Sequence, residues 1–402
     1  MPLPSLARIP APPDPILGIA EAFREDTRPG RINLSSGVFV NASGVTPVLD
    51  TVLEAERRLA AAAGTKLYRP IDGEVAYREL VRSLALGPDH EAVTSRRALA
   101  TQTPGGTGGL RVAADLLHQT GASETIWLSE PTWPNHPHLF EAAGFRVRAY
   151  PYTDAGGRRI DEEAMLAALA TASPGDIVLL HGACHNPTGV DPSPDLWRRI
   201  GDLVEERRVL PLVDLAYQGF GDGLEQDAAG LRELVRPGAE LLVSTSFSKT
   251  FSLYAERVGA LIVIAASAAD AAAVQSHVKS AVRTNYSNPP AHGADIVRTI
   301  LADPDLRARW EAELAAMRDR INANRVAFVE ALDAHRIPGD WGAIADQRGM
   351  FALLGLTTEQ VKRLRDEHAV YVVGRGRINV AGFTDANLGP FCEALAAVVG
   401  AG

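Results

Sequence analysis

The sequence has 402 residues, of which 46% are hydrophobic and 22% are charged, so it can bury a large core and is not intrinsically disordered. Forty basic and forty-nine acidic residues give a formal net charge of −9, which argues against non-specific nucleic-acid binding. Only two cysteines are present, which excludes a disulfide scaffold and a four-cysteine zinc module.

The N-terminal segment favours an extended arm. It has five prolines in its first thirteen residues and lacks the apolar stretch of a signal peptide. No apolar run in the chain reaches the length of a membrane span. We therefore expect a cytoplasmic protein that binds neither membranes nor nucleic acids.

Hydrophobic periodicity predicts helices that alternate with short strands along most of the chain. Helices are predicted at 51–62, 75–86, 109–119, 195–207 and 270–282, and strands at 126–128, 177–180, 210–213, 241–243 and 258–264. This alternation is typical of an α/β fold with a mostly parallel sheet between helices. A long helix at 304–333 follows, then strands at 350–354, 370–373 and 377–380 and helices at 358–368 and 387–399, which indicates a second, smaller α+β domain.

Polar side chains follow four of the predicted strands at the point where each strand ends. These clusters contain Trp133, His181 with Asn186, Asp214 with Tyr217, and Ser246 with Lys249. Each of these residues could instead have only a structural role, in the core, in a turn or at a helix cap. In an open parallel sheet, ligands bind outside the carboxyl ends of the strands. We therefore expect the four clusters to meet at one cleft.

Lys249 is one of only four lysines, and its position after a strand among hydroxyl groups suits Schiff-base chemistry. The alternative is a surface lysine in a polar loop.

Ser246, Ser248 and Arg257 are groups that a phosphate would need. A glycine-rich stretch at 104–111, which includes Gly106 and Thr107, opens a helix whose N-terminus could bind an anion, although on this stretch alone a plain helix N-cap is the more common interpretation.

The remaining candidates also have two readings each. Asp214 could pair with a protonated ring nitrogen or cap a helix. Asn186 could be a turn residue. Arg283 and Arg377 could each bind a carboxylate, and spacing alone does not separate Arg375 from Arg377.

His181 and His185 lie four residues apart, which on a helix could chelate zinc. The segment leads into an Asn-Pro-Thr-Gly turn, and no third ligand cluster is evident. We therefore expect hydrogen-bonded core histidines and no metal site.

Five motifs together resemble the class I aminotransferases of pyridoxal-phosphate fold type I, in the aspartate and aromatic amino-acid branch. They are SFSKTFSLYAERVG (246–259), HGACHNPTGVD (181–191), DLAYQGF (214–220), NYSNPPAHG (285–293) and GRINVAG (376–382). The resemblance runs from about residue 14 to the C-terminus. It implies a large domain with a mostly parallel seven-stranded sheet between helices, at 47–310, and a smaller α+β domain made of 15–46 and 311–402, preceded by an arm at 1–14.

The resemblance also implies roles for individual residues. Lys249 would form the internal aldimine with pyridoxal 5'-phosphate and move the substrate proton, while Asp214 would hold the pyridine nitrogen protonated. The remaining cofactor contacts would come from Tyr217, Asn186, Trp133, Ser246, Ser248, Arg257, Gly106 and Thr107. Substrate contacts would come from Gly37, Trp133, Asn186, Phe351 and Arg377. Tyr68 and Arg283 would reach in from the other subunit of a homodimer.

The implied reaction is a ping-pong transamination between an L-amino acid and 2-oxoglutarate or another 2-oxo acid. Leu67 and Val40 resemble the aromatic branch, whereas Thr46, Thr107 and Asn288 resemble the aspartate branch, so we expect aspartate or glutamate and tyrosine or phenylalanine to be donors. Gly105 replaces a serine that is common in the family, which keeps β-elimination or decarboxylation on the same fold as an alternative. A non-catalytic regulatory or binding module is a third hypothesis, weakened by the complete set of core site residues.

Overall fold

The computed structural model describes residues 17–121, 124–154 and 156–400. The predicted arm at 1–14 lies outside these ranges. Within the described part of the chain, no helix is both long enough and apolar enough to cross a membrane.

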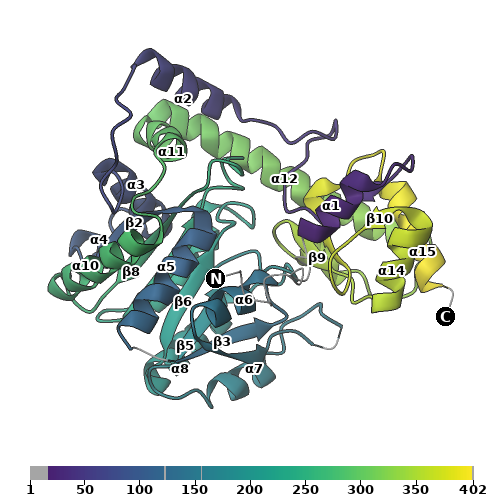
Figure 1. Cartoon of the computed structure of the whole chain (residues 1–402). Coiled ribbons are helices and arrows are strands. Elements are labelled where there is room, and N and C mark those ends of the chain that lie inside the picture. Colours follow the sequence, from purple (N-terminus) through teal and green to yellow (C-terminus); the bar gives the residue numbers. More distant parts are fainter. Residues whose placement is uncertain (1–16, 122–123, 155, 401–402) are drawn as a thin grey trace, which may run out of the picture.

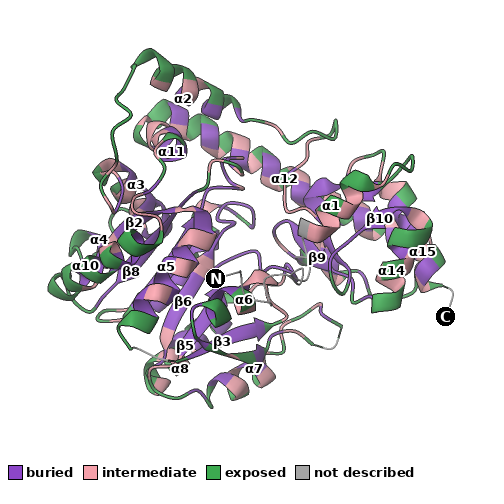
Figure 2. Ribbon diagram, in the orientation of Figure 1, coloured by how far each residue is buried: buried purple, intermediate pink, exposed green. Residues whose placement is uncertain are grey.

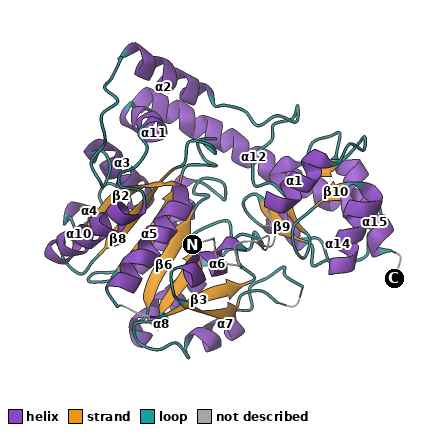
Figure 3. Cartoon of the chain, in the orientation of Figure 1, coloured by secondary structure: helices purple, strands orange, loops and turns teal. Residues whose placement is uncertain are grey.

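A seven-stranded sheet forms the centre of the molecule (Figure 3). Its strands are β2 (Ala98–Pro104), β3 (Thr125–Glu130), β4 (Arg146–Pro151), β5 (Ile177–His181), β6 (Leu210–Leu215), β7 (Leu241–Ser246) and β8 (Val258–Ile264). They lie in the order β2-β8-β7-β6-β5-β3-β4. β8 pairs antiparallel with β2 and β7, and all other neighbours pair in parallel, so the prediction of a mostly parallel sheet is confirmed.

Helices cover both faces of this sheet (Figure 1). They are α3 (Val75–Leu86), α4 (Glu91–Thr94), α5 (Gly105–Gln119), α6 (Asn135–Ala142), α7 (Glu162–Leu169), α8 (Pro194–Arg207), α9 (Leu224–Leu234), α10 (Ala268–Asn285) and α11 (His292–Ala302). Helix α2 (Asp50–Ala61) packs on α11 instead. Within β5, Val178 and Leu180 join the apolar core that contains α8 and α9, whereas Ile177 and Leu179 join the core that contains α5 and α10. Every residue of β5 is buried, which explains its continuous apolar sequence (Figure 2).

The long helix α12 (Pro304–Ala334) runs from α11 to the C-terminal elements (Figure 1). Asp303 caps its first turn, because the carboxylate accepts hydrogen bonds from the backbone N–H groups of Asp305 and Leu306. Pro304 suits the first helical position because no intrahelical hydrogen bond is lost there.

The first and last parts of the described chain lie side by side. These parts contain α1 (Leu17–Glu25), β1 (Ile32–Asn33), α13 (Ala343–Asp346), β9 (Phe351–Leu353), α14 (Thr358–His368), β10 (Val370–Tyr371), β11 (Arg377–Asn379), the 3-10 helix η2 (Val380–Gly382) and α15 (Leu388–Val399). β1 pairs in parallel with β10, and β9 pairs antiparallel with β11. This pairing brings Phe351 and Arg377 to the side of the sheet where β5, β6 and β7 end.

Candidate active site

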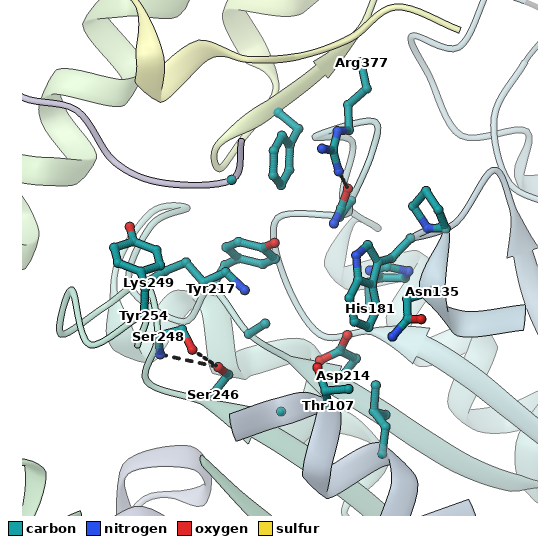
Figure 4. A pocket seen from close by; sticks show the side chains of 18 of the residues that line it. Thr107, Asn135, His181, Asp214, Tyr217, Ser246, Ser248, Lys249, Tyr254 and Arg377 are labelled. Carbon is teal, nitrogen blue, oxygen red and sulfur yellow. Dashed lines mark hydrogen bonds between the residues drawn. The ribbon is translucent and has the colours of Figure 1, made fainter. Parts of the chain in front are cut away.

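A cavity of about 570 Å³ lies at the carboxyl ends of β5, β6 and β7 (Figure 4). Of the predicted site residues, those that line it are Gly37, Gly106, Thr107, Trp133, Asn186, Asp214, Tyr217, Ser246, Ser248, Lys249, Arg257, Phe351 and Arg377. The expectation that the four polar clusters meet at one cleft is confirmed. Tyr68 and Arg283 do not line the cavity of their own chain.

One end of the cavity is built from groups that favour an anion. Helix α5 begins there with Pro104 as N-cap, which offers no side-chain cap, so its first N–H groups are left for a ligand. The hydroxyl groups of Ser246 and Ser248 lie 3.2 Å apart, and Arg257 Nη1 donates to Ser248 Oγ at 3.1 Å. A Cβ on Gly105 would lie only 2.5 Å from the Arg257 guanidinium, so a side chain at this position would push the arginine aside. These groups fit a phosphate.

Asp214 supplies a negative charge deeper in the cavity, at the end of β6. Its Oδ2 lies 3.2 Å from Nε2 of the fully buried His136, and Nδ1 of that histidine lies 2.8 Å from the Thr132 hydroxyl. Burial opposes ionisation of Asp214, but the hydrogen bond from His136, together with the electrostatic effect of the neighbouring histidines and Lys249, outweighs it and lowers the pKa of the carboxyl. The carboxylate therefore stays ionised and can complement a protonated ring nitrogen. We did not predict His136; the only signal was its position three residues after Trp133.

The prediction of hydrogen-bonded histidines is confirmed for both members of the pair. His181 Nε2 lies 3.2 Å from the Thr132 hydroxyl, and His185 Nε2 lies 3.0 Å from the Ser129 hydroxyl. Burial lowers the pKa of His181 to about 3, so this ring is neutral at physiological pH. Within the described ranges, no three histidine, cysteine or acidic side chains are grouped to hold a metal ion.

Lys249 lies three residues after β7, and its Nζ is 4.8 Å from the centre of the Tyr217 ring. Burial, together with the charges of Arg257 and Arg377 and against the opposing charge of Asp214, lowers the pKa of Lys249 to about 8. More of the amine is therefore uncharged near neutral pH than in a free lysine. An uncharged amine is the form that attacks a carbonyl group.

Arg377 is a buried cation, and no carboxylate of the described residues forms an ion pair with it. Its Nη1 donates to Asn186 Oδ1 at 3.2 Å, its Nη2 donates to the Ser35 carbonyl at 2.8 Å, and its guanidinium stacks on Phe351 at 4.3 Å. Its Nε has no hydrogen-bond partner. Arg375 is exposed, so the structure separates the two arginines that spacing alone could not.

Tyr254 is a second residue that we did not predict for the site. It lines the cavity, and its hydroxyl accepts a hydrogen bond from the Phe39 backbone N–H at 2.9 Å. This bond connects the segment that follows β1 to the loop that carries Lys249. A tyrosine five residues after Lys249 has no distinguishing local signal in the sequence.

Anion-binding groups, a carboxylate for a ring nitrogen, an amine of lowered pKa and an unpaired arginine all face one cavity. This set fits an enzyme that uses pyridoxal phosphate on an amino acid. Comparison with known proteins gives the same class, because the family model described as "Aminotransferase class I and II" matches residues 29–395. The chain belongs to this aminotransferase family.

Relatives from both branches cover the chain almost completely. The aspartate aminotransferase of Escherichia coli is 48% identical over 97% of this chain and 98% of its own length. The aromatic-amino-acid aminotransferase of Pseudomonas aeruginosa is 47% identical, with 98% of each chain covered. A crystal structure of the Burkholderia pseudomallei aromatic-amino-acid aminotransferase, with pyridoxal phosphate covalently bound, has a TM-score of 0.95 and 48% identity over 99% of this chain and 100% of that one.

These findings confirm the predicted fold type, the predicted cofactor and transamination as the reaction. The cofactor is pyridoxal 5'-phosphate. Elimination or decarboxylation, the alternative chemistry on this fold, is not favoured, because the relatives at this level of identity are aminotransferases.

Proposed function

We propose that this enzyme transfers the amino group of aspartate or glutamate, and of tyrosine or phenylalanine, to 2-oxoglutarate or another 2-oxo acid. The observation that carries the proposal is Arg377. A buried guanidinium that opens into a cavity without a carboxylate partner is costly unless a ligand supplies the anion. Amino acids and 2-oxo acids share such a group, the carboxylate next to the reacting carbon.

Pyridoxal phosphate, when bound, supplies an electron sink for negative charge on the substrate carbon. In our proposal, Ser246, Ser248 and Arg257 hold the phosphate together with the first turn of α5, to which Gly106 and Thr107 belong. Asp214 holds a proton at the ring nitrogen, and Trp133 offers a flat face to the ring. Tyr217 and Asn186 donate hydrogen bonds to the ring oxygen.

Lys249 is the proposed acid–base group. Because burial lowers its pKa to about 8, the amine can take a proton from the substrate carbon and return it within the neutral pH range. Arg377 and Asn186 orient the substrate by its carboxylate, and Gly37 and Phe351 limit the space beside it.

Two features support acceptance of both donor classes. The curated relatives include aspartate and aromatic-amino-acid aminotransferases at almost equal identity. The Trp133 and Phe351 rings give the cavity apolar surface that suits an aromatic substrate, whereas Arg283 of a second subunit would suit a distal carboxylate.

We also propose a homodimer with shared sites. Tyr68 is 93% exposed and Leu67 is 76% exposed, and the same part of the chain carries exposed Val45, Val48 and Leu53. Exposed apolar side chains of this kind are typical of a protein interface.

Two further expectations stay predictions from the sequence. They are the cytoplasmic location and the division into an arm (1–14), a large domain (47–310) and a small domain (15–46 and 311–402).

An absorbance experiment tests the proposed function. The purified enzyme is given L-aspartate, L-glutamate, L-tyrosine or L-phenylalanine singly, without any 2-oxo acid. We expect each to replace the spectrum of the pyridoxal form by that of the pyridoxamine form, and we expect Lys249→Ala to abolish steady-state turnover. Persistence of the original band with all four amino acids would contradict the proposed substrates, and wild-type turnover by Lys249→Ala would contradict the proposed mechanism.

A further inference from the structure

A second cavity of about 510 Å³ lies outside the active site, between α3, α4 and β2. These elements lie together on one side of the sheet region (Figure 1). Three arginines line the cavity: Arg78 and Arg82 on α3, and Arg96 in the turn before β2. Its apolar wall comes from Val75, Val93, Leu99 and Ala100. None of these residues lines the active-site cavity or takes part in the proposed reaction.

Positive charge in this cavity is incompletely balanced by the protein. Arg78 pairs with Asp72 at 2.9 Å, but Asp72 also accepts an ion pair from Lys279 at 3.0 Å. Glu79 is the one carboxylate among the lining residues. Within the described ranges, neither Arg82 nor Arg96 has a carboxylate at ion-pair distance.

The arginines also have unused hydrogen-bonding capacity. Arg82 Nη1 donates to the Ala98 carbonyl at 3.1 Å, but the buried Nε atoms of Arg78 and Arg82 have no partner. Arg78 and Arg82 lie four residues apart on α3, a spacing at which like charges repel. Burial lowers the pKa of Arg82; the charge of Glu79 opposes this shift, and the charges of Arg78 and Arg96 add to it. An anion bound in the cavity that these arginines line would offset this repulsion.

We propose that this cavity binds a small organic anion with at least two negative charges on phosphate or carboxylate groups. Guanidinium groups bind both of these groups in a bidentate manner. The volume is that of a small-molecule site, and the aliphatic wall accommodates a carbon skeleton. The site is independent of the proposed substrates, because it shares no lining residue with the active site.

Calorimetric titration of the enzyme saturated with pyridoxal phosphate tests the site. Pyrophosphate and citrate are the probes, since they carry phosphate and carboxylate charge respectively, and sodium chloride of equal ionic strength is the blank. Saturation with the cofactor fills the phosphate position of the active site. We expect one probe ion to bind per chain, and the probe that binds more tightly identifies the preferred group.

Three variants locate the binding. Arg96→Gln changes an exposed side chain and is expected to weaken binding at least tenfold, as is Arg82→Gln. Arg309→Gln, which changes an exposed arginine on α12, serves as the matched control and should bind like the wild type. No saturable binding of either probe at millimolar concentration would overturn the proposal. It would also fall if binding persisted in Arg96→Gln but disappeared in Arg377→Lys, because the anion would then occupy the active site.

Discussion

Replacement of Arg325 by methionine should weaken both the fold and the binding of the substrate carboxylate. This arginine lies on α12 and is completely buried, and it pairs with no carboxylate in the part of the chain that the structure describes. Its Nη2 donates to three backbone carbonyls, those of Arg348, Gly349 and Phe351, at 3.1, 2.6 and 2.7 Å. The guanidinium therefore fixes the segment that enters β9 and places the Phe351 ring.

The size of the effect follows from these contacts. Methionine leaves the carbonyls of Gly349 and Phe351 without their shortest hydrogen bonds, and an unsatisfied buried acceptor costs about 1–3 kcal/mol. Removal of the cation offsets part of this cost, since burial is the main cause that lowers the pKa of Arg325 to about 9. The two carbonyls together would cost about 2–6 kcal/mol, so with this offset we expect a loss near the lower end, about 2 kcal/mol in the free energy of unfolding.

Binding of substrate should also weaken, because Phe351 stacks on Arg377 at 4.3 Å. A buried cation–π contact contributes about 1–2 kcal/mol, so loss of its geometry predicts a KM for the amino donor raised roughly five- to thirtyfold. The value of kcat should change less, because Lys249 and Asp214 lie on other elements.

Urea denaturation of the enzyme loaded with pyridoxal phosphate, together with steady-state kinetics, measures both effects. Arg309→Met is the control on the same helix, because Arg309 is exposed. Arg325→Lys keeps the charge but loses the planar array of donors, so it should lie between the wild type and Arg325→Met. If Arg325→Met unfolded within about 0.5 kcal/mol of the wild type and kept its KM, the reasoning would be refuted.

Two further substitutions test the charges in the cavity. Because the pKa of Lys249 falls to about 8 in the folded protein, the unfolded chain binds the extra proton between pH 8 and 10.5, and apoenzyme stability should rise with pH there. Lys249→Met apoenzyme should therefore be more stable than wild-type apoenzyme at pH 7, by up to about 3 kcal/mol in the free energy of unfolding. This difference should shrink by pH 9.5. If urea denaturation gave the same difference at both pH values, the lowered pKa of Lys249 would be contradicted. Arg377→Lys should reduce kcat/KM by roughly 30- to 4000-fold, the equivalent of about 2–5 kcal/mol for a buried charged hydrogen-bonded pair, while cofactor absorbance is retained. An unchanged kcat/KM would contradict the role of Arg377.

The buried strands of the sheet were the most predictable part of the fold. β5 and β8 are buried along their whole length, so continuous apolar runs identified them. β2 carries the polar sequence Thr-Gln-Thr. β4 lies at the edge of the sheet, and four of its six residues are exposed. Neither strand therefore showed an apolar run. The start of α5 was placed at residue 109, four residues late, because glycines at its N-terminus do not follow the helical pattern.

The sequence predicted site residues wherever a functional side chain follows a strand directly. Asp214 and Lys249 come from elements next to each other in the sheet, so their convergence follows from topology. His136 lies in the first turn of α6 and Tyr254 in the turn after Lys249, and the positions of both depend on tertiary packing that their neighbours in the chain do not reveal. Their roles arise from single hydrogen bonds to Asp214 and Phe39, which only the folded structure defines.

Arg325 and Arg377 show why residue type and spacing cannot assign a role on their own. Both are buried arginines in the last quarter of the chain, and neither pairs with a carboxylate. The two terminal nitrogens of Arg325 have five acceptors, four of them backbone carbonyls, so these nitrogens are occupied within the protein. Those of Arg377 have only two acceptors, and its guanidinium opens into the cavity. The difference between a structural and a binding arginine thus lies in which hydrogen bonds the fold leaves unmade.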